Sequence, residues 1–223
     1  MAYAFGAPSI VQDGLVFYVD AANGDSYISG SSDTFSLINP SITGSLKNDT
    51  SFAASNAGIW DFDGTDDNIN FGNSSVFTFT PNITLSTWIK SDGDWNQSFP
   101  FFLSKGTNVS YMLFGNRQSS TTLKARLRIG INGDANKVDS INTIGTNTWH
   151  CLTGTFDGST LKIYINGSLD NSKSLSQAIP SGTDDFKINH NFNGQMGPTM
   201  IYNHTLSAQE VLQNYNALKG RFI

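Results

Sequence analysis

The chain has 223 residues, only 14% of them charged, and its formal net charge is −5 at pH 7. A length of this order suits one large β domain, because sandwiches and barrels often reach it undivided. The acidic balance argues against nucleic acid as the main partner, since phosphates require a basic stripe. The one local basic run, Lys124, Arg126 and Arg128, alternates with apolar residues and predicts the solvated side of one strand.

Neither secretion nor membrane insertion is expected from the sequence. Residues 1–13 lack the basic region and the apolar core of a signal peptide. No apolar run approaches the length of a membrane span. Cys151 is the only cysteine, so this chain forms no internal disulfide, and we expect the thiol to pack as a small buried hydrophobe. These features favour a protein that is made and assembled in a cytoplasm.

Short strands separated by turn residues are predicted along most of the chain. Residues 1–13 form either an arm or the first edge strand, and residues 14–20 form a strand. Residues 21–58 are expected to be a long surface connection with one or two short strands. The later strands are predicted at 59–64, 68–72, 83–91, 99–106, 110–115, 123–133, 149–167 (a hairpin), 186–190 and 197–203. Many short strands between Gly-rich turns are typical of an antiparallel sandwich.

The hairpin at 149–167 has the clearest strand pattern. Asp157-Gly158 supplies its turn, because glycine freely adopts positive φ. Leu161 and Ile163 line one face of the returning strand and Tyr164 lies on the other. The hairpin therefore has two different faces and carries no catalytic pattern.

One helix is predicted near the end of the chain, over residues 206–217. Ser207 and Glu210 have the spacing of a capping box, in which the hydroxyl and the carboxylate each accept a backbone N–H. Glu210 is the only glutamate, and this cap accounts for it. Glycosidases need two carboxylates at a defined spacing, and no Ser/His/Asp or metalloprotease motif occurs. The sequence predicts a protein that is not an enzyme.

Acidic residues crowd into the turn after residue 60, where Asp66, Asp67 and Asn68 offer hard oxygen ligands of the kind calcium prefers. The alternative is that these side chains only hydrogen-bond the local backbone of a turn. Both interpretations stay open.

A candidate glycan site lies between two predicted strands, at Trp95, Asn96, Gln97 and Phe99. A sugar ring offers an apolar face and a rim of hydroxyls, which suits aromatic and amide side chains. The alternative is that Trp95 or Phe99 packs on the edge of the sandwich or in a subunit contact. The other three tryptophans are expected in the core: Trp60, Trp88 and Trp149.

Four segments occur in the order of the strand motifs of one family: FDGTDDNINFG, ITLSTWIKS, WHCLTGTFDGSTLKIYING and FNGQMGPTMIYNHTLSAQEV. They resemble the laminin-G-like, concanavalin A-like lectin/glucanase domains, over residues 14 to about 216. The resemblance implies an all-β, antiparallel jelly-roll β-sandwich over residues 14–223, ending in one short helix. It also implies calcium near the rim and carbohydrate or protein partners at the rim loops.

The opening DGLVFYVDAAN and the ending NYNALKGRFI are similar to versions of this domain in tailed-phage structural proteins. This narrower resemblance implies a non-enzymatic virion component, assembled in the host cytoplasm: a head decoration, a knob or part of a tail fibre. Its partners would be capsid or tail proteins, further copies of itself in a homo-oligomer, and glycans on the host surface. The alternative is a soluble, calcium-dependent carbohydrate-binding module not tied to a virion.

Overall fold

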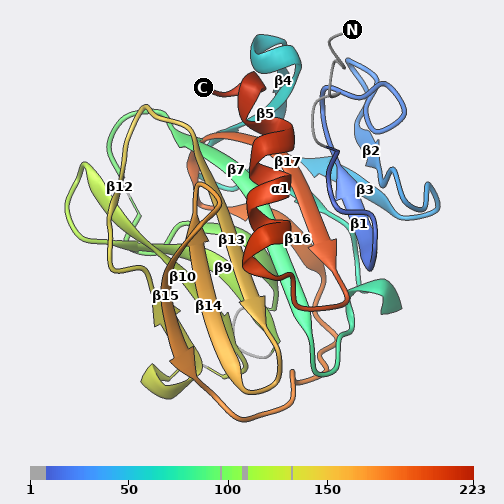
Figure 1. Ribbon diagram of the computed structural model, residues 1–223. Coiled ribbons are helices and arrows are strands. Elements are labelled where there is room, and N and C mark those ends of the chain that lie inside the picture. The colour runs from blue at the N-terminus through green and yellow to red at the C-terminus, as the bar shows by residue number, and fades with distance from the viewer. Residues whose placement is uncertain (1–8, 96, 107–109, 132) are drawn as a thin grey trace, which may run out of the picture.

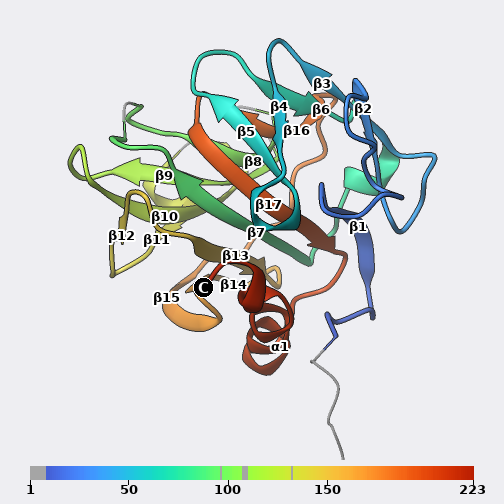
Figure 2. The same cartoon turned by 90° about the horizontal axis from the view of Figure 1, so that it is seen from above.

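The computed structural model describes residues 9–95, 97–106, 110–131 and 133–223. In this part of the chain, two antiparallel sheets pack face to face, and one helix covers the outer face of one sheet (Figures 1 and 2). This arrangement confirms the predicted β-sandwich with a short C-terminal helix.

Sheet A carries the helix on its outer face. Its strands are β1 (Leu15–Val19), β4 (Ser51–Ala53), β5 (Ile59–Asp63), β7 (Ile83–Ser91), β13 (His150–Phe156), β14 (Thr160–Ile165), β15 (Ser168–Ser174) and β17 (Asn193–Tyr202). Their order is β15-β14-β13-β7-β17-β5-β4, and β1 also pairs with β17. The predicted hairpin forms as β13 and β14, and β7 has the bounds expected from its sequence.

Sheet B has no helix on its outer face within the described residues. Its strands are β2 (Asp33–Phe35), β3 (Thr43–Lys47), β6 (Asn68–Asn70), β8 (Phe101–Lys105), β9 (Tyr111–Arg117), β10 (Thr122–Ile129), β11 (Lys137–Asp139), β12 (Ile144–Gly145) and β16 (Phe186–His190). Their order is β11-β10-β9-β8-β16-β6-β3-β2, with β12 paired to β10. Because β5 belongs to sheet A and β6 to sheet B, the acidic turn crosses from one sheet to the other.

The main core lies between the sheets and is rich in aromatic rings. Phe17, Phe71, Phe77 and Phe186 pack together, and the rings of Phe77 and Phe186 stack with centroids 4.4 Å apart. Burying each of these side chains contributes about 1.5–3 kcal/mol. The alternation of strand residues explains how the sheets supply this core, since every second side chain faces inward.

A second core lies between sheet A and helix α1 (Ala208–Leu218). Trp88 is fully buried there and stacks on Tyr215 and Phe222, with centroid distances of 5.6 and 4.4 Å. The capping box of Ser207 and Glu210 is present, so this prediction is confirmed. The helix starts two residues later than expected, because Ser207 is the extended cap residue that precedes the first turn.

Residues 9–13, the described part of the predicted arm, form no strand and lie against α1. The Val11 amide donates to Asn214 Oδ1 at 2.8 Å, and its carbonyl accepts from the Tyr202 hydroxyl at 3.0 Å. Residues 1–8 lie outside the described residues. No helix in the described part of the chain is both long and apolar enough to cross a membrane.

Two expectations about surface segments are wrong. Arg126 and Arg128 are only 7% and 6% exposed, although their alternation on β10 predicted a solvated side. Arg126 pairs with Asp139, and both guanidinium groups lie over the ring of Phe114. Residues 21–58 contain three strands instead of one or two, because β2, β3 and β4 extend the sheet edges. The register of β10 against β9 and β11 decides the first case, and the pairing of β2, β3 and β4 with their neighbours decides the second.

Candidate functional site

Three loops meet at one end of the sandwich and enclose a pocket of about 210 Å³, here called the rim pocket. They are residues 64–67 after β5, residues 92–95 and 97–100 after β7, and residues 191–192 between β16 and β17. The strand ends that carry them are neighbours in sheet A, because Asn193 pairs with Asp63 and Gly194 pairs with Ser91. The rim pocket is therefore built from segments far apart in the sequence.

Gly64 allows the first loop to approach the third. Its φ is +81°, and a Cβ at this position would lie 2.6 Å from Cβ of Asn193. Any side chain would meet both a strained backbone and a steric clash. The close contact of these two loops thus depends on this glycine.

The structure brings two of the predicted glycan residues together in the rim pocket. Trp95 and Gln97 both line it, whereas Phe99 is not among its lining residues, and Asn96 lies outside the described residues. Phe99 is 45% exposed and contacts the ring of Phe114 at a centroid distance of 6.4 Å. Of the four residues predicted for the glycan site, the structure thus places Trp95 and Gln97 at the pocket.

Trp95 is buried in the wall of the rim pocket. It is only 3% exposed and its ring packs on Phe192 at a centroid distance of 5.9 Å, so it offers no exposed ring face for stacking. Its backbone is held by Ser120 and by Arg117, whose Nη1 donates to the Trp95 carbonyl at 3.0 Å. The indole Nε1 has no hydrogen-bond partner. Trp60 and Trp88 also have unpartnered indole nitrogens, but of the three only Trp95 lines the rim pocket.

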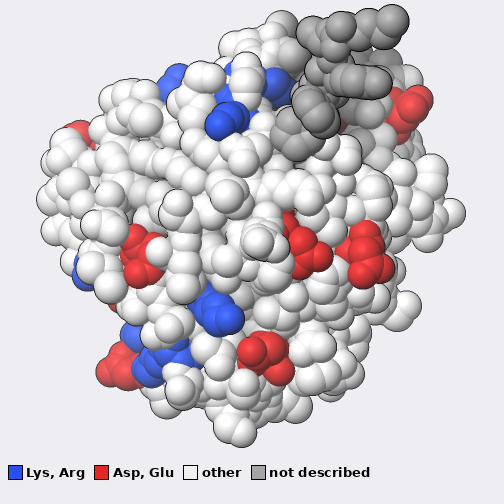
Figure 3. Space-filling view, in the orientation of Figure 1, with Lys and Arg blue, Asp and Glu red and all other residues white. Residues whose placement is uncertain are grey.

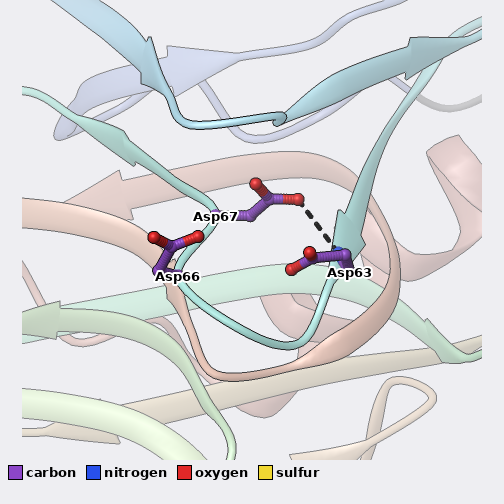
Figure 4. Close-up of side chains that lie close together, drawn as sticks. All are labelled: Asp63, Asp66 and Asp67. Atoms are coloured by element: carbon purple, nitrogen blue, oxygen red, sulfur yellow. Dashed lines mark hydrogen bonds between the residues drawn. The ribbon is translucent and has the colours of Figure 1, made fainter.

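Figure 4 shows three carboxylates gathered over the turn between β5 and β6. One oxygen from each of Asp63, Asp66 and Asp67 lies within 4.8 Å of the others. Asp66 and Asp67 of the predicted set thus lie together with Asp63 beside them, and a role of Asn68 as a ligand stays a prediction. Asn68 Nδ2 donates to the Asp66 carbonyl at 2.9 Å, which leaves Asn68 Oδ1 without a hydrogen-bond partner. Three carboxylates are hard oxygen donors and fit calcium chemically; an ion at this turn stays a prediction.

Asp67 organises the turn. It is 2% exposed, and its two carboxylate oxygens accept the backbone N–H groups of Asp49 and Asp63, each at 2.9 Å. Burial raises the pKa of Asp67 above its ordinary value, and the two N–H groups oppose this rise. The local hydrogen bonds of the turn interpretation are therefore present.

The acidic turn and the rim pocket are physically connected. Asn189, which is 1% exposed, donates from Nδ2 to the Asp67 carbonyl at 2.9 Å and accepts the Phe192 amide at 3.0 Å. Asp63 belongs to the acidic cluster and also lines the rim pocket. Sequence reasoning gave residues Asn189 to Asn193 no role in a site, and their Asn-rich composition, at the junction of β16 and β17, was the only local signal.

The family model described as the concanavalin A-like lectin/glucanases superfamily matches residues 63–212, more than half of the chain. No curated protein matches the chain.

Several solved structures share the fold at low sequence identity. The binding domain of Paraclostridial Mosquitocidal Protein 1 is 16% identical, with a TM-score of 0.69 over 92% of this chain and 52% of that chain. Domain 4 of AbnA, an extracellular arabinanase from Geobacillus stearothermophilus solved with arabinotriose, is 18% identical, with a TM-score of 0.64 over 90% of this chain and 98% of that chain. The binding domain of Botulinum Neurotoxin DC, solved with SialylT, is 11% identical, with a TM-score of 0.65 over 92% and 52%. This chain thus spans about half of the length of the two toxin domains.

Proposed function

The chain belongs to the concanavalin A-like lectin/glucanases superfamily, and from this premise we propose that it is a carbohydrate-binding domain whose ligand occupies the rim pocket. Trp95 carries the proposal. It is 3% exposed, it lines the pocket, and its indole N–H has no acceptor. A buried donor left unpaired costs about 1–3 kcal/mol, and a sugar hydroxyl in the pocket would supply the missing acceptor.

The rest of the rim pocket has the mixed chemistry that a sugar requires. Asp63, Gln97 and Asn191 bring a carboxylate and two amides, which accept from and donate to hydroxyl groups. Phe192 adds an apolar surface beside the Trp95 ring. A few polar groups around an apolar wall are typical of small-ligand sites. The saccharide bound by the similar arabinanase domain supports the same ligand class.

We propose binding without turnover. The only glutamate, Glu210, caps α1. Of the two carboxylates that line the rim pocket, Asp63 and Asp94, the first accepts the Thr65 amide at 2.7 Å and so shapes its own loop. An assay for new reducing ends tests this. If the wild type cleaves a bound oligosaccharide and Asp94→Asn does not, the protein is a glycosidase instead.

A glycan array tests the binding proposal directly, with the wild type, Trp95→Phe and Trp88→Phe compared at equal folded fraction. Trp95→Phe removes the buried indole N–H from the pocket wall and keeps an aromatic ring, so we expect it to weaken binding roughly tenfold. Trp88→Phe is the matched control, since it removes another unpartnered indole N–H that is buried under α1. Absence of binding to every glycan would refute the function, and equal loss in both variants would refute the site.

We also propose that the domain displays the rim pocket on a virion of a tailed phage. Its geometry supports display: Asn193 at the start of β17 borders the pocket, whereas Tyr202 at its end contacts Val11. The ten residues of β17 separate these ends by about 30 Å. The face that α1 covers carries few and scattered charges (Figure 3), which does not favour nucleic acid there. Sedimentation of the protein together with purified tailed-phage particles tests this role. If the protein stays wholly in the supernatant, the proposed virion role is contradicted.

A further inference from the structure

The charged groups of the rim pocket all have one sign. Asp63 at the end of β5 and Asp94 in the loop after β7 both line the pocket, and its described lining residues include no Lys, Arg or His. The ion pairs within the described part of the chain all lie elsewhere. The two carboxylates are therefore not balanced by a basic side chain in the pocket wall.

Further carboxylates surround this pocket. Segments 61–67 and 92–94 contain four and two acidic residues, together a third of the eighteen in the chain, and no Lys or Arg. Burial raises the pKa of Asp61, and the nearby charge of Asp92 raises it further. Lys90 opposes this rise, but it does not line the pocket. A hollow lined by one sign of charge concentrates ligands of the opposite sign.

Trp95 places a hydrogen-bond donor among these acceptors. The side chain is 3% exposed, it lines the pocket, and its indole Nε1 has no hydrogen-bond partner. Arg117 holds the Trp95 carbonyl at 3.0 Å from Nη1 and does not line the pocket. The unpartnered donor is an observation independent of the carboxylates, and it calls for an oxygen atom on the ligand.

The two demands together describe one kind of ligand. An ionised carboxylate only accepts hydrogen bonds, and an ammonium group offers it three N–H donors together with a positive charge. A hydroxyl group offers one donor without charge, and its oxygen accepts from an indole N–H. A sugar ring with a free amino group carries both groups on one small frame.

We propose that the rim pocket selects an amino sugar with a free ammonium group over neutral and acidic sugars. The ammonium group binds between Asp63 and Asp94, and a hydroxyl oxygen of the same ring accepts from Trp95. The inference rests on the proposed carbohydrate function and adds the charge of the ligand. N-acetylation of the amine removes that charge, and a carboxylate on the sugar is repelled by both aspartates.

Sugars that differ only at carbon 2 test this selectivity. The probes are glucosamine, glucose and N-acetylglucosamine, with the matching galactose set, titrated into 15N-labelled protein at about pH 6, where amines are protonated. The chain has four tryptophans, and Trp95→Phe identifies which indole N–H signal belongs to Trp95.

We expect each amino sugar to shift the Trp95 indole signal and to bind roughly three- to tenfold tighter than its neutral counterpart, because exposed ion pairs are individually weak. Salt at about 0.5 M should reduce this ratio of Kd values, since it screens exposed charges. The salt titration uses the wild type and so needs no variant to fold.

Substitution of the two aspartates locates the selectivity. Asp94 is exposed, and Asp94→Asn should lower the ratio of Kd values between the neutral sugar and the amino sugar. The double variant Asp63→Asn/Asp94→Asn should bring the ratio to about one. Asp13→Asn is the matched control, because it removes the same charge from an exposed residue just before Leu15, which pairs with Tyr202 at the other end of β17. It should keep the wild-type ratio.

Failure of the selectivity and failure of the carbohydrate function give different results. Equal affinity for amino and neutral sugars, or a preference that survives the double variant, overturns the selectivity while sugar binding stands. Tighter binding of N-acetylneuraminic acid than of glucosamine overturns it as well. If N-acetyl-lysine amide binds as tightly as glucosamine, the pocket recognises a lysine side chain and both proposals are overturned. If no sugar binds, with or without calcium, the carbohydrate function fails and the selectivity fails with it.

Discussion

Asp67→Asn is the sharpest test of how the acidic turn supports the rim pocket. The wild-type carboxylate accepts two backbone N–H groups, from Asp49 and Asp63, each at 2.9 Å. Hydrogen bonds to a charged group contribute about 1.5–3 kcal/mol each. An asparagine keeps one acceptor oxygen and turns an NH2 group toward the other N–H. Part of this loss is offset, because burial disfavours the charged form of Asp67 and raises its pKa.

We therefore expect Asp67→Asn to lower the free energy of unfolding by about 1–3 kcal/mol. Urea denaturation followed by tryptophan fluorescence measures this value, and an unchanged m-value shows that the wild type and Asp67→Asn expose the same surface on unfolding. Each kcal/mol corresponds to about 2–4 °C in Tm for a chain of this size.

Asp66→Asn is the matched control for this experiment. Asp66 is exposed, and its recorded hydrogen bonds use its backbone carbonyl, which the substitution retains. We expect a change within about 0.5 kcal/mol. An Asp67→Asn effect no larger than that of Asp66→Asn would refute the role assigned to the buried carboxylate.

The Asp66→Asn variant also tests calcium binding at the acidic turn. A bound ion raises the Tm of the wild type by linkage, and we expect Asp66→Asn to remove this rise. If the Tm of the wild type does not rise in excess calcium, the acidic turn has only a structural role.

Three further predictions concern the scaffold. Burial raises the pKa of the Cys151 thiol to about 12, so a thiol reagent at pH 8 should label the protein only after unfolding; rapid native labelling would contradict this. Hydrogen bonds from Ser207 to the Glu210 carboxylate lower the pKa of Glu210. The wild type should therefore be more stable than Glu210→Gln above the unfolded pKa of about 4.3 and lose this advantage as the pH falls through the lower folded pKa. Urea titrations at several pH values measure this, and a difference in unfolding free energy that does not change with pH would contradict the role of the carboxylate in the cap. Gly194 has φ +145°, and an added Cβ would lie 2.3 Å from the Lys90 carbonyl, so Gly194→Ala should cost about 1–3 kcal/mol or more. Gly24→Ala, where a Cβ meets nothing within 4 Å, is its control; equal Tm values for the two variants would refute the clash.

Local sequence was sufficient wherever a pattern acts over a few residues. The alternation around Asp157-Gly158 predicted the β13–β14 hairpin, because strand faces and a tight turn depend only on neighbouring residues. The Ser207–Glu210 spacing predicted the helix cap for the same reason. The family resemblance then ordered these elements into a sandwich, and the family model agrees with it.

Burial of individual side chains depended on contacts across the sheets. The alternation on β10 was correct, yet Arg126 and Arg128 lie buried over the ring of Phe114 instead of in solvent. The environment of a side chain on an outer face is determined by the residues opposite it on the neighbouring strands, here Phe114 on β9 and Asp139 on β11, and the register of each pairing decides which residues these are. A one-dimensional pattern specifies which face a residue occupies but not what covers it.

The sequence by itself determined the class of fold, the capped helix, the absence of a glutamate pair and two of the three segments from which the rim pocket is built. Only the tertiary structure decided that these segments meet. Trp95 and Asp63 approach each other because β5 and β7 both flank β17, which places the three loop ends side by side. Strand alternation and capping are local interactions, whereas a pocket requires that distant segments be neighbours. Sheet order supplies that proximity, and no spacing along this chain encodes it.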